Sequence, residues 1–246
     1  MGCTMNEYAF QILDCLPYIN KSLQDEEYIN FLWETFCANY EKEKYQFAFI
    51  AYHMLFMSFV YFSIWKIKII REKDFSKALI GFDKDCEKKM INASSPFAFS
   101  EINESNIFRF FKLVGCKNDK IGEFTKIVKT RNTISHSNGN IFFNSQDSLD
   151  EKINEVLQCI FKIQEHTECI IEDIFKQFIK NNWDSNNREC IDDGDQIREI
   201  LIQKNYFSKK DIEYCLTFDI NLLKQEKNFT KIIKFFKTFQ KEYSEN

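Results

Sequence analysis

The sequence predicts an all-α protein, and two observations support this prediction. Only 6 glycines and 2 prolines occur among 246 residues, whereas sandwiches, barrels and doubly wound sheets need many tight turns made largely by such residues. Apolar residues recur with helical rather than alternating spacing along the whole chain. Because 44% of the residues are apolar, a disordered chain is also excluded. We therefore expect long helices joined by short polar links.

The apolar spacing predicts helices in the following order along the chain. They span residues 5–16, 24–40, 43–71, 74–90, 104–114, 119–137, 149–181, 195–205, 208–225 and 229–242. Gly115 and Gly139 fall where a left-handed residue would end the preceding helix. The longest helix follows Ser148-Leu149-Asp150-Glu151, which has the pattern of a capping box.

A polar stretch rich in Asn and Asp, from 181 to 195, predicts a linker. We therefore expect a helical bundle at 1–181 and a C-terminal helical extension at 182–246. Within this stretch the acidic cluster around Asp192 lacks the further ligands and the spacing of a calcium loop. We interpret the cluster as a solvated loop.

Net charge and cysteine usage exclude several classes of protein. A net charge of −4 excludes a general binder of polyanions, so any binding of nucleic acid must come from a local patch. The 9 cysteines form no Cys-x-x-Cys pair and are accompanied by only 3 histidines, so the spacing of zinc ligands is absent and neither a metal nor a cofactor is expected. Asn6, Glu7 and Asp14 interrupt any early apolar run, so we expect no secretory signal and a reduced, cytoplasmic protein.

The segment from 47 to 65 contains no formally charged residue and is long enough to cross a membrane. A helix that is apolar all round is either a membrane span or the central helix of a soluble bundle. Because the other predicted helices are amphipathic, we favour the central helix. His53 is then a hydrogen-bonded histidine of the core.

The chemically informative residues lie in the helix predicted at 119–137. On a helical wheel Arg131 falls within the apolar arc, while Asn132 and His136 lie one turn apart at its edge, flanked by Lys126 and Lys129. An arginine on a buried face needs an anion, a partner charge or an interface. Histidine can act as a general acid or base, and arginine binds phosphate, so the pair suits metal-free phosphodiester chemistry. The alternative is a structural salt bridge of Arg131 and a helix end capped by His136.

These residues resemble the signature of the HEPN superfamily, an Arg followed by a polar residue and, after four to six intervening positions, a His. Arg131 matches the Arg, Asn132 the polar residue and His136 the His. The motif ends one predicted helix and precedes a long amphipathic one, and the resemblance covers about residues 43–181. Neither His53 nor His166 follows an arginine at the motif distance, so the chain has a single match.

The resemblance implies an all-α bundle with metal-independent ribonuclease activity, used in toxin–antitoxin pairs, abortive infection or other antiviral systems. In such enzymes two motifs meet across a dimer interface, so a homodimer with a composite active site is implied, with an antitoxin or another defence protein as a possible partner. The implied substrate is single-stranded RNA, cleaved by attack of the 2′-OH on the adjacent phosphate. His136 would be the general acid or base, Arg131 would stabilise the charge of the transition state, and Asn132 would orient one of them.

Three further residues are candidates for substrate binding. Lys126 and Lys129 would hold flanking phosphates, while Asn138 would either position the substrate or shape the turn. HEPN toxins paired with a nucleotidyltransferase antitoxin often have a Tyr where this chain has Asn138, so silencing by modification of that tyrosine is not expected.

Two other hypotheses remain open from the sequence. The first is a non-catalytic helical interaction module of a toxin–antitoxin or defence complex, which would bind a partner through its aromatic-rich faces. The second is a membrane-anchored effector that inserts residues 47–65. We expect the wild-type chain to be soluble without detergent if the second hypothesis is wrong.

Overall fold

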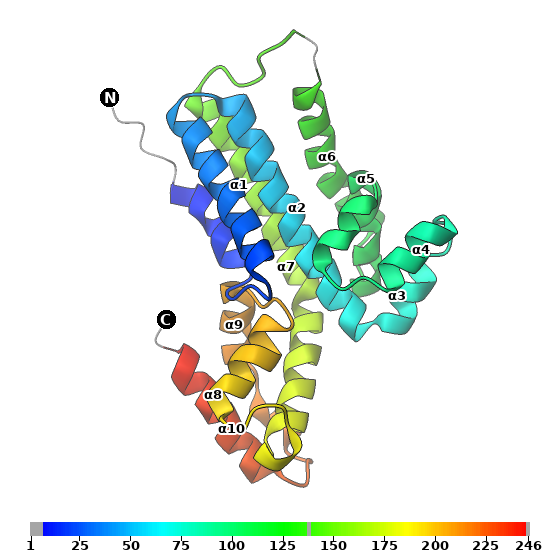
Figure 1. Ribbon diagram of the computed structural model, residues 1–246, viewed down its shortest axis with the longest axis vertical. Coiled ribbons are helices and arrows are strands. Elements are labelled where there is room, and N and C mark those ends of the chain that lie inside the picture. Colours follow the sequence, from blue (N-terminus) through cyan, green and yellow to red (C-terminus); the bar gives the residue numbers. More distant parts are fainter. Residues whose placement is uncertain (1–6, 137–138, 245–246) are drawn as a thin grey trace. The chain divides into compact units, whose positions relative to one another are not determined.

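The computed structural model describes residues 7–136 and 139–244, which form helices and no β-strand (Figure 1). The chain divides into two compact units. The first comprises residues 1–13 and 22–167, and the second comprises residues 14–21 and 168–246. The predicted all-α class is confirmed.

The first unit is made mainly of long α-helices joined by short helical turns. Its elements are η1 (Glu7–Cys15), whose last two residues belong to the second unit, α1 (Leu23–Glu41), α2 (Tyr45–Ile70), α3 (Glu72–Ala78), α4 (Lys84–Ile91), η2 (Pro96–Glu101), α5 (Glu104–Ile107), η3 (Phe108–Val114), α6 (Asn118–Ser135) and the part of α7 (Gln146–Asn182) up to residue 167.

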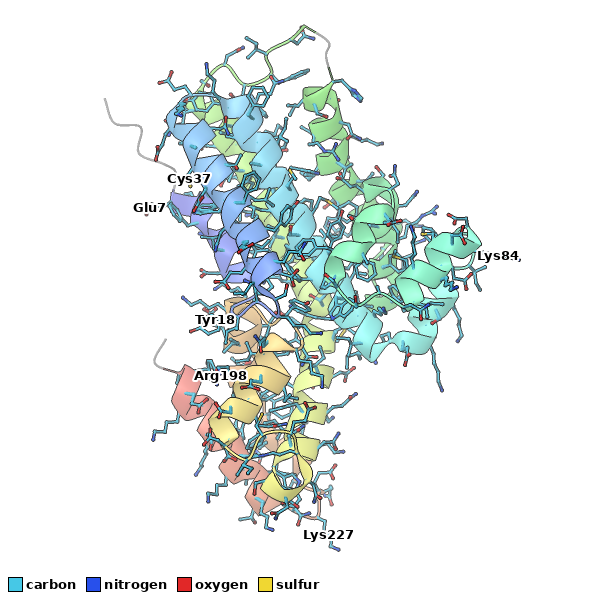
Figure 2. The ribbon with its side chains drawn as sticks, viewed as in Figure 1. Glu7, Tyr18, Cys37, Lys84, Arg198 and Lys227 are labelled. Atoms are coloured by element: carbon cyan, nitrogen blue, oxygen red, sulfur yellow. The ribbon has the colours of Figure 1, made fainter. Side chains whose placement is uncertain are left out.

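The second unit contains the rest of α7 and a group of shorter helices. These are η4 (Ser185–Asn187), α8 (Asp193–Gln196), the π-helical turn η5 (Ile197–Gln203), α9 (Lys209–Leu216), η6 (Ile220–Leu223) and α10 (Phe229–Tyr243). The exposed charged side chains include Lys84 of α4 in the first unit and Lys227 before α10 in the second (Figure 2).

Helix α2 is the central helix of the first unit. It is long and apolar enough to cross a membrane, but 83% of its most apolar window is buried inside the protein. Its aromatic side chains contact neighbouring elements, as in the stacked pair of Phe56 with Phe108 of η3. This burial supports the interpretation of residues 47–65 as a core helix, because most of its apolar side chains are already covered by the rest of the protein.

Two of the predicted helices are divided or partly replaced by 3-10 turns. The segment predicted as one helix at 74–90 is broken by Gly81, whose φ is +101°, and Asp83 then caps α4 by accepting a bond from the Cys86 N–H at 2.9 Å. The segment at 104–114 begins with α5 and continues as the 3-10 helix η3. Gly115 ends it in the predicted left-handed conformation, with φ +80°.

Helix α7 confirms the predicted apolar stripe but begins earlier than expected. All its predicted stripe residues are buried: Leu149, Ile153, Val156, Ile160, Ile163, Ile170, Ile174 and Phe178. The predicted capping box at Ser148 is wrong, because the helix already begins at Gln146. Ser145 is the capping residue, and its hydroxyl accepts a bond from the Ser148 N–H at 3.3 Å.

The polar stretch predicted as a linker is a folded part of the second unit. The side chain of Arg188 is fully buried and donates to the carbonyl oxygens of Asn182 and Cys190 at 2.9 and 2.8 Å. It also forms an ion pair with Asp193 at 2.6 Å and lies 5.2 Å from the centre of the Phe235 ring on α10. Arg188 therefore connects the loop to the aromatic core of the unit.

The boundary between the units also differs from the predicted one at 181/182. It lies within α7, between Thr167 and Glu168, and the segment 14–21 belongs to the second unit. There, Tyr18 N–H donates to the carbonyl of Phe207 at 2.7 Å. The apolar stripe of α7 is continuous, so its spacing does not indicate where the neighbours of the helix change.

Candidate functional site

Helix α6 positions the candidate site because its apolar face is buried against the first unit. The five apolar residues of the predicted arc are all 9% exposed or less: Ile121, Phe124, Ile127, Val128 and Ile134. The Phe124 ring contacts Phe108 and Phe111 of η3. This packing fixes the rotation of α6 about its own axis and therefore the direction of the polar residues at its edge.

Arg131 occupies the half-buried edge of this face, where 24% of its side chain is exposed. Its Nη2 forms an ion pair with the Oε2 of Glu104 on α5. The same oxygen lies 3.1 Å from Nε2 of His53 on α2. The three residues form the cluster His53–Glu104–Arg131, which joins α2, α5 and α6.

The charges of this cluster follow from its burial. Burial lowers the pKa of His53, which is 1% exposed, and this effect exceeds the opposing effect of Glu104. Burial alone would raise the pKa of Glu104, but its bonds to His53 and Arg131 together hold that pKa below its ordinary value. We therefore infer a neutral His53 that donates from Nε2 to an ionised Glu104, which leaves the buried Nδ1 of His53 as an acceptor without a partner.

Asn132 lies next to Arg131 and shares a surface hollow of about 450 Å³ with it. The hollow is lined by Ser100, Glu101, Ile102, Asn103, Glu104, Val128, Arg131 and Asn132. It therefore combines a guanidinium, two carboxamides and two carboxylates. A phosphate entering it would meet Arg131 as the attractive group and Glu104 as the group that holds Arg131 in place.

His136 closes α6 and is exposed. Its backbone N–H donates to the carbonyl of Asn132 at 3.3 Å, and its extended conformation, with ψ 141°, turns the chain away from the helix. Among the described residues His136 does not line the hollow of Arg131, and neither do the exposed Lys126 and Lys129.

The sequence predicts roles for two residues after α6, Asn138 and Gly139, and the structure describes only the second. Asn138 lies outside the described residues. Gly139 does have a left-handed conformation, with φ +77°, but the helix already ends at His136, so the prediction that Gly139 caps it is wrong.

Sequence reasoning identified Arg131 and the core position of His53, but not Glu104. A half-buried arginine requires a counter-charge, yet the chain holds 37 acidic residues and none is marked as the partner by its spacing. Glu104 lies 27 positions before Arg131 and is the first residue of the short helix α5. Only the tertiary packing of α5 against α6 brings the two together.

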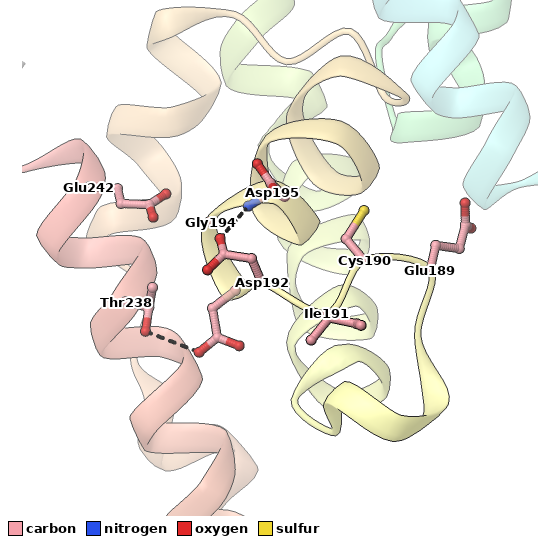
Figure 3. Close-up of a pocket in the computed structure, with 9 residues that line it drawn as sticks. Glu189, Cys190, Ile191, Asp192, Gly194, Asp195, Thr238 and Glu242 are labelled. Atoms are coloured by element: carbon pink, nitrogen blue, oxygen red, sulfur yellow. Dashed lines mark hydrogen bonds between the residues drawn. The ribbon is translucent and has the colours of Figure 1, made fainter.

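The acidic cluster of the second unit borders a hollow in which each aspartate has a local role (Figure 3). Asp192 caps α8 by accepting a bond from the Asp195 N–H at 3.0 Å, Asp193 pairs with Arg188, and Asp195 pairs with Arg198 at 2.6 Å. Burial and the nearby Asp192 raise the pKa of Glu242 on the opposite wall. In the described part of the chain no group of three or more His, Cys, Asp or Glu side chains has an arrangement that could hold a metal ion.

Comparison with known proteins adds no further identification. No known protein family, curated protein or solved structure matches this chain.

Proposed function

We propose that this protein is a metal-independent endoribonuclease of the HEPN type that cleaves single-stranded RNA. The observation that supports the proposal best is the position of Arg131. It lies on an open hollow beside Asn132, is held by Glu104, and belongs to a helix that ends in the exposed His136.

The proposed reaction needs only groups that the motif supplies. The ribose 2′-oxygen attacks the adjacent phosphorus and loses its proton to a base, while the bond from phosphorus to the 5′-oxygen breaks and that oxygen gains a proton. The products are a 2′,3′-cyclic phosphate and a 5′-OH. His136 acts as the general base or acid, Arg131 stabilises the additional negative charge on the phosphorane, and Asn132 orients one of these groups.

Glu104 supports this role by positioning the guanidinium without occupying all of it. The contact uses Nη2 of Arg131, and an arginine has five N–H donors in a planar fork. The donors on Nε and Nη1 are therefore available to a phosphate. Lys126 and Lys129, both exposed on α6, are the proposed contacts to flanking phosphates.

A second copy of the chain is part of the proposal. Arg131 and His136 are five residues apart, which corresponds to about 140° around a straight helix, and His136 does not line the hollow of Arg131. A homodimer that brings two motifs together would supply His136 of one copy to Arg131 of the other. We propose a role as a toxin or antiviral effector for such a dimer, in the cytoplasm.

The test is cleavage of a mixed RNA pool by the purified chain in EDTA. We expect the wild-type chain to cleave, and His136→Ala and Arg131→Ala to lose at least about a hundredfold in rate, as is typical when a general acid–base group is removed. Melting temperatures of the variants serve as the folding control. Cleavage by His136→Ala at the wild-type rate would contradict the proposal. Cleavage by the wild-type chain that occurs only when a divalent metal is added would contradict it too.

The contacts of Arg131 also favour a second candidate, a non-catalytic interaction module. The cluster His53–Glu104–Arg131 joins three helices, and this is itself a sufficient structural use for the arginine. For such a module Arg131→Ala would lower stability but leave cellular toxicity unchanged, provided that the variant remains folded. Substitutions on its partner-binding faces would abolish function instead.

A further inference from the structure

The most basic surface of the second unit lies on α10 and the loop before it. Residues 224–241 contain six lysines and one glutamate, a surplus of five positive charges in a chain with a net charge of −4. All six lysines are exposed: Lys224, Lys227, Lys231, Lys234, Lys237 and Lys241. The single glutamate, Glu226, is paired with Lys180 at 2.5 Å and does not neutralise them.

Three of these lysines form a row on one face of α10. The buried face of the helix consists of Ile232, Phe235, Phe236 and Phe239, which are 4% exposed or less. At 100° per residue, Lys234, Lys237 and Lys241 fall within about 60° of one another, directly opposite that buried face. We name these three residues the lysine row.

No carboxylate lies on the face of the lysine row. The one acidic residue of α10, Glu242, falls about 80° or more away around the helix and borders the hollow of Gly194 and Asp192. Within residues 139–244, as described by the structure, none of the three lysines forms an ion pair. Most other basic side chains of this unit, such as Arg188 and Arg198, are paired with acids.

The chemistry of this surface indicates the class of its partner. Between residues 224 and 241 no large apolar side chain is strongly exposed, whereas protein interfaces depend on buried apolar or aromatic anchors. The apolar face of α10 is already buried, so the helix has no face to insert into a membrane. Successive lysines are separated by about 5 Å along the helix, and their long side chains can reach successive charges of a linear polyanion.

One aromatic ring adds to this surface. Nζ of Lys231, on the flank of the row, lies 5.0 Å from the centre of the Trp183 ring, and Trp183 is partly exposed. Aromatic side chains beside lysines are the usual stacking platforms for bases of single strands.

We propose that the lysine row, together with Lys231 and Trp183, binds the phosphodiester backbone of a single-stranded nucleic acid. The preference for RNA rests on the proposed function, but the binding itself does not. The contact is electrostatic and independent of sequence, because lysines opposite a phosphate carry no information about the base.

The test is fluorescence anisotropy with a short labelled single-stranded oligonucleotide of mixed sequence and the full chain. A DNA oligonucleotide lacks the attacking 2′-OH, so its binding is measured with the wild-type chain whether or not the protein is a ribonuclease. An RNA oligonucleotide is measured in the His136→Ala background. The variant Lys234→Gln/Lys237→Gln/Lys241→Gln is compared with Lys73→Gln/Lys84→Gln/Lys88→Gln, which removes the same charge from exposed lysines of the first unit.

We expect the row variant to bind about tenfold more weakly at moderate salt, and the slope of log K against log salt to fall by about 2, because each lost phosphate contact removes about 0.7 from it. The control variant and a Lys→Arg version of the row should bind like the parent chain. Equal binding by the row and control variants would overturn the proposal. Tighter binding to polyglutamate or to phosphatidylserine vesicles than to both oligonucleotides would also overturn it.

Discussion

At the scale of single residues, the candidate site depends on Glu104. Its Oε2 contacts both Arg131 and His53, so one carboxylate fixes the arginine of the motif and accepts a hydrogen bond from Nε2 of the buried His53. The regular apolar spacing of α6 predicts Arg131 within the buried arc of the helix, whereas the structure places it at the half-buried edge of that arc. Sequence reasoning could not identify Glu104, since the partner of a charge is determined by tertiary packing and not by local pattern.

The first prediction concerns the contribution of Glu104 to stability. Glu104→Gln keeps the shape of the side chain but removes the charge that holds Arg131, so we expect the free energy of unfolding to fall by about 1–3 kcal/mol at neutral pH. Glu101→Gln is the matched control, because Glu101 is paired with Lys89 at an exposed position and should cost less than about 1 kcal/mol. Urea denaturation measures both. If the free energy of unfolding falls equally in the two variants, the ion pair of Glu104 with Arg131 does not stabilise the site more than an exposed pair would.

The second prediction concerns pH and His53. Because burial holds the pKa of His53 below its ordinary 6.5, the unfolded chain binds more protons at this position, and the stability that this histidine provides is lost as pH falls below about 6.5. We expect His53→Gln to flatten this part of the stability–pH curve. His136→Gln, which replaces an exposed histidine, is the control variant. A wild-type curve that is flat below pH 6.5 would contradict the inferred neutral His53.

At the scale of elements, regular apolar spacing was sufficient to predict the helices that form the core. The buried face of α6 and the stripe of α7 were predictable because burial of one face imposes the helical period on the sequence. The central helix α2 was predictable from its uninterrupted apolar run. Boundaries were less predictable. Ser145 and Ser148 are equally good capping residues in isolation, so the sequence alone did not show that α7 begins after Ser145.

The polar stretch 181–195 shows why composition alone led to the prediction of a linker. Its residues are of the types common in loops, but the N–H groups of Arg188 donate hydrogen bonds to carbonyl oxygens of the loop itself and to the carboxylate of Asp193. An exposed arginine and a buried one with many acceptors look the same in sequence. The distinction depends on whether a ring such as that of Phe235 covers the guanidinium.

The third prediction follows from this burial. Arg188→Ala removes the ion-pair partner of Asp193 and a donor to the carbonyl oxygens of Asn182 and Cys190, so we expect the second unit to lose about 1–3 kcal/mol of stability. Arg198→Ala is the control, because its pair with Asp195 is exposed and contributes less than about 1 kcal/mol. Hydrogen exchange of the amides of α8 and α10 reports on this unit specifically. If these amides exchange as slowly in Arg188→Ala as in the wild-type chain, the structural role of Arg188 is contradicted.

At the scale of the whole molecule, the basic residues are unevenly distributed although the net charge is −4. The motif helix α6 has the exposed Lys126 and Lys129, and the second unit has the lysine row, while carboxylates neutralise many other basic residues. The all-α class and the basic character of α6 were predictable from composition and periodicity. The division within α7 was not, because a continuous helix gives no local signal where its packing partners change.

The most direct test of the central claim compares two substrates of the same sequence in EDTA. One is single-stranded RNA, and the other has 2′-deoxyribose throughout. The proposed reaction predicts that the wild-type chain cleaves only the RNA, that the products end in a 2′,3′-cyclic phosphate, and that His136→Ala abolishes the cleavage. Cleavage of the deoxy substrate, or products with a 5′-phosphate, would contradict it.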